Sequence, residues 1–209
     1  MEYMRTLPDK AFDLAVVDPP YGIGESGAKN HTRGKCAAAK DYPPFAGHDA
    51  HPPDAAYFAE LFRVSRNQIV FGANHFISRM PFDSSCWLVW DKQNGSTDFA
   101  DCELAWTSFR SAVRKFEYRW QGMLQGNMAH KEQRIHPTQK PVELYKWIFS
   151  RFAKSGDRIL DTHLGSGSSR IAAYDLGLDF VGCELDPVYY KLEEKRFARH
   201  SQQLNLFID

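Results

Sequence analysis

The sequence predicts an α/β fold built on a mixed, mostly parallel sheet. Short apolar runs rich in β-branched residues end abruptly at proline, glycine or a charged residue, as buried strands do. Stretches of helical period lie between several of these runs, which is typical of a sheet with helices packed on it. One pair of neighbouring runs is expected to form an antiparallel edge. Strands are expected at 12–17, 68–71, 87–90, 103–107, 158–161 and 179–184.

The composition limits the class of protein. A chain of 209 residues with 43% hydrophobic residues can bury the core of one domain, so we expect a single domain over 1–209. We find no membrane-spanning run and no signal peptide, which predicts a cytoplasmic protein without a membrane partner. The formal net charge is zero, so a nucleic-acid surface would need local segregation of charge. We expect reduced thiols and no metal site from the scattered cysteines Cys36, Cys86, Cys102 and Cys183.

The first predicted strand ends at Asp18-Pro19-Pro20-Tyr21. Neither proline has a backbone N–H for a sheet, so the strand stops and a rigid loop begins. Such a loop suits the binding of a planar ring that carries an amino group. Asp18 can accept one N–H of the amine, and the Pro19 carbonyl, stiffened by Pro20, can accept the other. Tyr21 can stack on the ring. The alternative is a plain proline turn that Asp18 caps.

Residues 22–51 show no sustained period and are predicted to form a long mobile loop. A lid over a site and plain disorder both fit this composition, and the two interpretations are compatible. Pro52-Pro53-Asp54 then opens a helix that we expect to run to about Arg66. A second amphipathic helix is expected from Val142 to Ala153.

Residues 107–140 gather positive charge among aromatic side chains. Seven Lys and Arg residues stand against two Glu residues, with Phe, Tyr and Trp interleaved. This pattern suits a nucleic-acid face, where cations neutralise phosphates and rings stack or wedge. A solvated charged hairpin is the alternative. The candidate DNA contacts in this small basic insertion are Arg110, Arg114, Lys115, Arg119, Lys131, Arg134, His136 and Lys140.

The last third of the chain predicts a βαβ unit with a glycine-rich first turn. Asp161 ends its first strand, Gly165-Ser166-Gly167 opens its helix, and Glu184 ends its second strand. The turn lacks the third glycine of the dinucleotide fingerprint and the Lys-Ser/Thr of a P-loop. A cofactor with a ribose but no pyrophosphate is therefore expected, and S-adenosylmethionine fits. Asp161 and the loop backbone would meet its amino-acid portion, and Glu184 its ribose hydroxyls.

Together these motifs resemble the β-class DNA amino-methyltransferases, which methylate adenine N6 or cytosine N4. Trp90-Asp91-Lys92 and the segment from Asp101 to Trp106 resemble small phage or prophage members of that family. Asp18-Pro19-Pro20-Tyr21 matches the catalytic tetrapeptide of that family. Asp161 with Gly165–Gly167 matches the cofactor loop, and Glu184 the ribose ligand. The segment from His136 to Pro141 matches the one that precedes this loop. The resemblance implies a Rossmann-like S-adenosylmethionine-dependent methyltransferase fold in permuted order, with the catalytic loop first.

The resemblance also implies an enzyme of DNA methylation, of the kind found in restriction-modification, that flips its target base out of the duplex. It assigns residues 107–140 as a short target-recognition segment, and it is compatible with a homodimer. Asp-Pro-Pro-Tyr favours adenine N6 over cytosine N4 within the family. The implied catalytic residues are Asp18, Pro19, Pro20 and Tyr21. The implied cofactor-binding residues are Asp161, His163, Gly165, Ser166, Gly167, Glu184 and Asp18.

The sequence departs from the family pattern in two places. Thr162-His163-Leu164 replaces the commoner Pro-Phe pair beside the cofactor loop. Members usually carry a further strand before the segment that Met1–Met4 resembles, so we expect part of the adenine pocket to be missing.

Three other classes share features with this chain. A nicotinamide-dependent oxidoreductase shares the βαβ unit but has no use for the Asp18–Tyr21 loop. Protein-glutamine methyltransferases usually carry Asn at the first position of that loop and have the cofactor loop first. A non-catalytic nucleic-acid-binding subunit stays open as an alternative.

Overall fold

The structure is a computed structural model that describes residues 1–24, 49–95, 100–121 and 124–204. Most of the mobile loop predicted at 22–51 therefore lies outside the described residues. So do its four basic residues and one of the cysteines, namely Lys29, Arg33, Lys35, Cys36 and Lys40.

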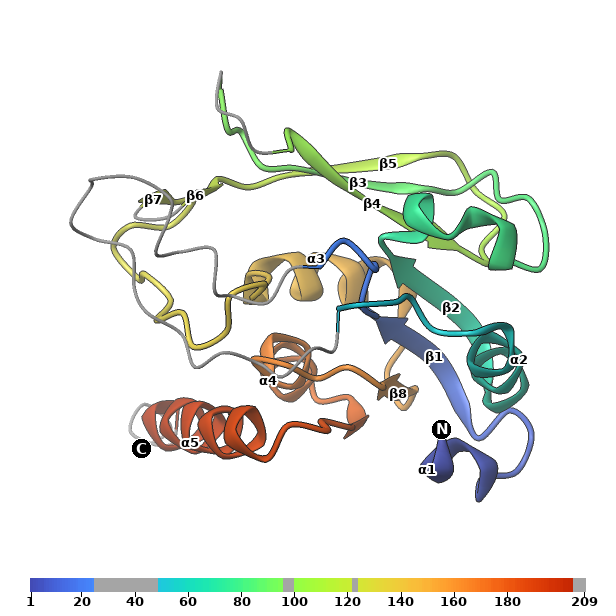
Figure 1. Cartoon of the computed structure of the whole chain (residues 1–209). Helices are drawn as coiled ribbons and strands as arrows, with labels where there is room; N and C mark the ends of the chain where they lie inside the picture. The colour runs from blue at the N-terminus through green and yellow to red at the C-terminus, as the bar shows by residue number, and fades with distance from the viewer. Residues whose placement is uncertain (25–48, 96–99, 122–123, 205–209) are drawn as a thin grey trace.

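A seven-stranded sheet forms the centre of the molecule (Figure 1). Its strands are β1 (Phe12–Val17), β2 (Ser65–Phe71), β3 (Leu88–Asp91), β4 (Cys102–Thr107), β5 (Arg114–Glu117), β8 (Arg158–Asp161) and β9 (Asp179–Gly182). The strand order is β5-β3-β4-β2-β1-β8-β9. β1 pairs in parallel with β2 and β8, and β8 with β9, whereas β4 runs antiparallel to β2 and β3. The predicted α/β fold with a mixed, mostly parallel sheet is confirmed.

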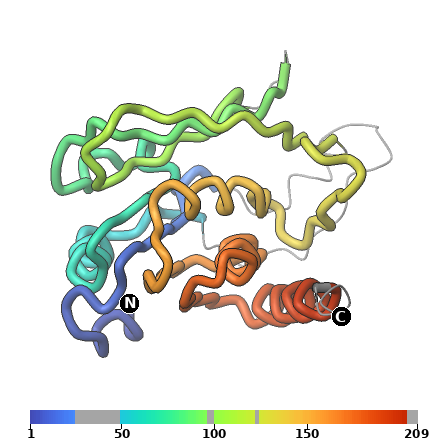
Figure 2. The backbone as a smooth tube through the Cα atoms, turned by 180° about the vertical axis from the view of Figure 1, so that it is seen from behind, coloured from blue at the N-terminus to red at the C-terminus, as the bar shows by residue number. Residues whose placement is uncertain are grey.

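Helices cover both faces of this sheet. They are α1 (Glu2–Arg5), α2 (Ala55–Val64), α3 (Val142–Phe152), α4 (Ser168–Asp175) and α5 (Pro187–Leu204), with the 3-10 helices η2 (Ala73–His75) and η3 (Ile77–Arg79). One buried cluster joins the sheet to α3 and α4, and a second joins it to α1 and α2. The view from behind in Figure 2 brings α3 in front of the strands. Among the helices of the described ranges, none is long and apolar enough to cross a membrane.

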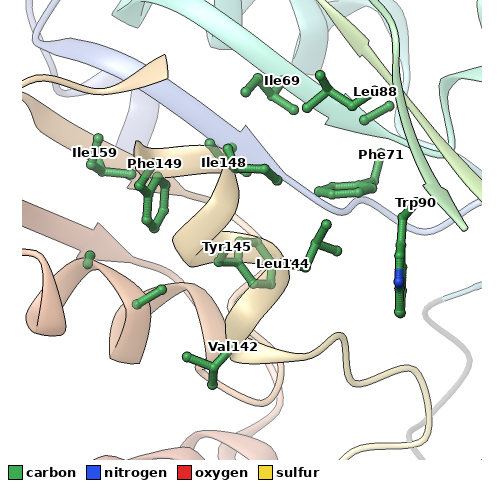
Figure 3. Packing of buried hydrophobic residues seen from close by; sticks show 14 of the residues in the cluster. Ile69, Phe71, Leu88, Trp90, Val142, Leu144, Tyr145, Ile148, Phe149 and Ile159 are labelled. Carbon is green, nitrogen blue, oxygen red and sulfur yellow. The ribbon is translucent and has the colours of Figure 1, made fainter. Parts of the chain in front are cut away.

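The alternation of side chains along β1 explains how one strand serves both clusters. Leu14 and Val16 belong to the α3 cluster, while Ala15 and Val17 face the α2 cluster. A strand buried on both faces reads as a continuous apolar run, which is why the sequence signal for β1 is strong. In Figure 3, α3 turns the side chains of Tyr145, Ile148 and Phe149 toward those of the sheet, among them Ile69, Phe71, Leu88 and Ile159.

The boundary between α2 and β2 differs from the predicted one. The sequence predicts a helix that reaches about Arg66 and a strand that begins at Gln68, but α2 ends at Val64 and β2 begins at Ser65. Ser65 has an extended backbone and pairs with Phe12 of β1, while its hydroxyl donates to the Leu61 carbonyl at 2.5 Å. Pairing with β1 thus places Ser65 and Arg66 in a strand, although the local sequence pattern favours a helix there.

The basic insertion expected at 107–140 is only partly an insertion. Arg114–Glu117 forms β5, which pairs in parallel with β3 at the edge of the main sheet. Beyond it, β6 (Trp120–Gln121) and β7 (Leu124–Gln125) form a small separate hairpin. The charged side chains of β5 are tolerated there because an edge strand with exposed charges resists pairing with other chains.

Candidate active site

The strands β1, β2, β8 and β9 are parallel, so their carboxyl ends meet at one edge of the sheet. In open α/β sheets this edge is where ligands bind. Asp18 follows β1, Gly72 follows β2, and Glu184 lies two residues beyond the end of β9. Because β4 is antiparallel, its first residues, including Glu103, lie at the same edge. The topology therefore brings the predicted catalytic loop and the predicted cofactor loop to the same edge.

The Asp18–Tyr21 loop folds back on itself. The Tyr21 hydroxyl donates to Asp18 Oδ1 at 2.6 Å, and the backbone N–H groups of Tyr21 and Gly22 donate to Asp49 Oδ1 at 2.7 and 2.9 Å. Burial, followed by the charge of Asp18, raises the pKa of Tyr21 well above its ordinary value, so the phenol stays a hydrogen-bond donor. Asp49, which sequence reasoning missed, fixes the loop backbone.

The ring of Tyr21 rests against the backbone of the neighbouring strand end. Gly72 has a φ of +66°, and a Cβ built there would lie 2.0 Å from the Tyr21 ring. Only glycine fits such a close approach in this left-handed conformation. The exposed His75 ring stacks on Tyr21, with centroids 5.1 Å apart and planes 14° apart. His75 is a further site residue that sequence reasoning missed, although it lies only three residues after Gly72, the glycine that follows β2.

Lys140 lies in the interior beside Asp18, which corrects its assignment as a DNA contact. Its side chain is 5% exposed, and Nζ donates to Asp18 Oδ2 at 2.6 Å. On its other side Nζ pairs with Glu103 Oε2 at 2.9 Å, and Glu103 also pairs with Lys92. Burial alone would raise the pKa of Glu103, but the ammonium groups of Lys140 and Lys92 lower it to about 2. The site therefore contains a row of alternating, paired charges.

The glycine-rich turn and Glu184 form one hydrogen-bonded unit. Gly165 and Gly167 have positive φ angles of 54° and 72°, as a sharp turn into α4 requires. Glu184 Oε2 accepts the Gly165 N–H at 2.7 Å, and Oε1 accepts the Asp186 N–H at 2.9 Å. The carboxylate of Glu184 is thus held against the turn, at the end of β9.

Asp161 supports this turn from below. It is 1% exposed, and its two oxygens accept the His163 N–H at 3.0 Å and the Ser169 hydroxyl at 2.6 Å. Burial raises the pKa of Asp161 to about 7. The His163 ring lies at 3.0 Å from Thr162 Oγ1, which in turn contacts the Tyr57 hydroxyl at 2.7 Å. These contacts hold the loop rather than expose the carboxylate.

The partly buried His163 should make stability depend on pH. Burial lowers the pKa of His163 to about 4, from an ordinary value of 6.5. The unfolded chain therefore binds a proton between these values that the folded protein excludes, so stability falls as the pH drops from about 6.5 to 4. His163→Gln should remove this fall in the free energy of unfolding. The fall reaches at most about 1.4 kcal/mol per pH unit.

Urea denaturation of wild type and His163→Gln from pH 7 to 4 measures the effect. We expect the free energy of unfolding of the wild type to fall more steeply than that of the variant. The exposed His130 supplies the control, since His130→Gln should follow the wild-type slope. Equal slopes for wild type and His163→Gln would contradict the prediction.

Three of the other candidate DNA contacts lie away from Asp18 in the sheet. β4 runs antiparallel to β2, so the connection at 108–113 that follows it lies at the sheet edge opposite Asp18. Arg110 and the start of β5, Arg114, are therefore far from the predicted catalytic loop, and Lys115 is paired with Glu117 and Asp91. These three candidate DNA contacts are exposed but do not lie beside Asp18, because sheet pairing turns the chain away.

Two further candidates are partly or fully buried. His136 packs edge-on against the Tyr189 ring at 4.3 Å, and burial lowers its pKa to about 4, so it is neutral near pH 7. A neutral buried ring cannot neutralise a phosphate, which corrects the assignment of His136. The Arg134 guanidinium stacks on Trp120 at 4.4 Å. Arg119 and Lys131, by contrast, are exposed beside the β6–β7 hairpin.

No group of three or more His, Cys, Asp or Glu side chains that could hold a metal ion occurs in the part of the chain that the structure describes.

Comparison with known proteins agrees with this arrangement. Residues 84–195, more than half of the chain, match the family model described as DNA methylase. The chain is similar to the type II methyltransferase M.HinfI of Haemophilus influenzae, with 25% identity over 244 residues. That match covers 94% of this chain and 66% of the length of M.HinfI.

Two solved structures share the fold. One is the M1.HpyAVI–SAM complex, with a TM-score of 0.54 and 17% identity, covering 93% of this chain and 91% of that one. The other is the PvuII DNA methyltransferase, named as cytosine-N4-specific, with a TM-score of 0.59 and 12% identity, covering 94% of this chain and 83% of that one. The predicted Rossmann-like methyltransferase fold is thereby confirmed. Since the family model spans more than half of its residues, this chain belongs to the N6/N4 DNA methylase family.

Proposed function

We propose that this protein transfers the methyl group of S-adenosylmethionine to the exocyclic amine of a flipped DNA base, and that the base is adenine and the atom N6. The observation that carries the proposal is the strand-end carboxylate of Asp18. It lies at the carboxyl edge of the sheet, 16% exposed, and is held by Tyr21 and Lys140 at 2.6 Å each. The glycine-rich turn with Glu184 lies at the same edge.

The residues present fit S-adenosylmethionine. Each oxygen of Glu184 accepts one backbone N–H and keeps a lone pair, so the carboxylate can still accept from two ribose hydroxyls. The turn offers no Lys-Ser/Thr for a pyrophosphate, which agrees with a cofactor that has none. Gly165, Ser166 and Gly167 would border the amino-acid portion, with Asp161 holding their loop from below. When bound, this cofactor supplies a methyl group activated by a sulfonium.

The exocyclic amine is a weak nucleophile, which the catalytic loop would activate. The lone pair of an exocyclic amine is delocalised into the ring, which makes the nitrogen unreactive. Asp18 and the Pro19 carbonyl would accept its two N–H groups, favour a pyramidal nitrogen and localise the lone pair. As the nitrogen gains the methyl group it gives up one proton, and Asp18 is the acceptor placed to take it. Holding both reactants in line supplies most of the acceleration.

The DNA surface is proposed for the exposed side of the β6–β7 hairpin. Arg119 and Lys131 are exposed there and suit phosphate contacts, while Leu124 and Met128 are 45% and 53% exposed and suit apolar contacts with a displaced strand. The adenine assignment follows from Asp at the first position of the tetrapeptide, where cytosine enzymes more often carry Ser.

Methylation of unmodified DNA, read by mass spectrometry of the digested nucleosides, tests the proposal. The protein is incubated with S-adenosylmethionine labelled in its methyl group and with DNA from cells that lack adenine and cytosine methylation. We expect labelled N6-methyladenine, and none when the cofactor is omitted. N4-methylcytosine as the sole product would overturn the base assignment, and no methylated base would overturn the enzyme proposal.

A further inference from the structure

Four charged side chains from four separate segments alternate in sign at the carboxyl edge of the sheet. In spatial order they are Lys92, Glu103, Lys140 and Asp18, each paired with the next. Their side chains are 18%, 21%, 5% and 16% exposed, so the row is largely withdrawn from water. Only Asp18 lies in the loop to which chemistry has been assigned, so the other three need an explanation.

We propose that Lys140 is a positioning residue that orients the Asp18 carboxylate toward the amine of the target base, and that Glu103 and Lys92 hold Lys140 in place. This inference rests on the proposed methyl transfer and adds residues to it. Lys140 itself is not expected to touch base or cofactor.

The hydrogen bonds at Asp18 support the positioning role. Lys140 Nζ donates to Oδ2 at 2.6 Å and the Tyr21 hydroxyl donates to Oδ1 at 2.6 Å, so the carboxylate is fixed on both oxygens and cannot rotate. A carboxylate oxygen has two lone pairs, and one therefore remains free on each for the amine. Without Lys140, Asp18 would keep the Tyr21 hydroxyl at Oδ1 but lose the donor at Oδ2, so its orientation would no longer be fixed on both oxygens.

Lys140 is itself fixed from three sides. Its Nζ donates to Asp18 Oδ2 and, at 3.3 Å, to the Tyr21 hydroxyl, and it forms an ion pair with Glu103 Oε2. Its backbone carbonyl accepts the Ser168 hydroxyl at 2.7 Å, at the first turn of α4. Lys140 thus connects the catalytic loop to the helix that follows the glycine-rich turn.

Glu103 balances the positive charge of Lys140. The amine nitrogen becomes positive as it gains a methyl group, and an unbalanced ammonium beside it would oppose that change. Lys140 pairs with Asp18 and Glu103, and Lys92 pairs with the second oxygen of Glu103. The two positive and two negative charges of the row therefore sum to zero. Lys140 can therefore orient Asp18 without adding net positive charge to the site.

Lys140→Met tests the proposal by separating binding from turnover. We expect kcat for methyl transfer to fall roughly a hundredfold, the loss that a misplacement of about 1 Å can produce. Affinities for S-adenosylmethionine, by calorimetry, and for DNA, by fluorescence anisotropy, should change by less than about threefold, since no contact with either is removed. The matched control is Lys146→Met, which removes another lysine ion pair, with Asp175, and should leave kcat unchanged.

A double-mutant cycle distinguishes positioning from a general structural effect. If Lys140 acts through Asp18, Lys140→Met added to Asp18→Asn should lower single-turnover rates by less than about threefold more, because the two changes affect one interaction. A full, multiplicative loss in the double variant would overturn the proposal. So would a wild-type kcat in Lys140→Met.

A second variant keeps the test decisive if Lys140→Met does not fold. Glu103→Gln leaves the Lys140–Asp18 pair in place and removes only its neutralisation, and we expect a fall in kcat of roughly tenfold with cofactor affinity retained. An unchanged kcat in this variant would overturn the role of Glu103. Absence of methyl transfer by the wild type would instead overturn the proposed function, so the two failures can be told apart.

Discussion

Asp18→Ala is expected to lower methyl transfer by on the order of 10³-fold or more while S-adenosylmethionine binding stays intact. Asp18 is the one side chain of the catalytic loop that can accept the amine proton with a full negative charge. The variant also leaves Lys140 with a single carboxylate, Glu103, instead of two. Cofactor binding should persist because Asp161 belongs to β8 and Glu184 follows β9, and no hydrogen bond joins either to Asp18 in the described residues.

Single-turnover methylation and calorimetric titration with the cofactor measure the two effects on the same preparation. Asp18→Asn is the milder companion variant, since an amide keeps one acceptor oxygen and should retain more activity than alanine. A fully active Asp18→Ala would contradict the mechanism. A variant that loses cofactor binding together with activity would show that the loop supports the cofactor site instead.

Glu184→Ala is expected to produce the second-largest effect, on cofactor affinity. Two ribose hydroxyls would lose a charged acceptor, and hydrogen bonds to charged groups contribute about 1.5–3 kcal/mol each. The variant also frees the N–H of Gly165, which Glu184 accepts at 2.7 Å, and so loosens the turn. Together these losses predict a rise in the dissociation constant of roughly 10²-fold or more.

Calorimetric titration of S-adenosylmethionine measures this rise, with Glu194→Ala as the matched control. Glu194 is a carboxylate on α5 that pairs with Arg170, so its removal also takes away a carboxylate with a partner but leaves the Glu184–Gly165 bond in place. Its affinity should equal that of the wild type. Unchanged affinity in Glu184→Ala would remove Glu184 from the cofactor site.

Several features could be predicted from the sequence because they depend on local backbone chemistry. Two adjacent prolines must end β1, so the position of the Asp18–Tyr21 loop follows from residue types alone. Gly165 and Gly167 likewise mark a turn that needs positive φ, and the apolar run of β1 marks a strand buried on both faces. These signals also placed the two loops at strand ends, and strand ends meet where strands are parallel.

The burial and pairing of the charged residues could not be predicted from the local sequence. Lys140 and Arg119 belong to the same basic stretch, yet Lys140 is buried beside Asp18 and Arg119 is exposed. The Lys140–Asp18 bond joins residues 122 positions apart, and no local pattern records such a pairing. The role of Glu103 was missed for the same reason, since its place at the site depends on the antiparallel direction of β4.

The α/β class, the strand-end tetrapeptide and the glycine-rich turn can thus be predicted from residue types, because proline and glycine restrict the backbone wherever they occur. Which cations face water, which side of the sheet each arginine reaches, and which groups fix Asp18 depend on the three-dimensional fold. The physical reason is that burial and ion pairing depend on strand order and direction, and these arise from contacts between distant segments.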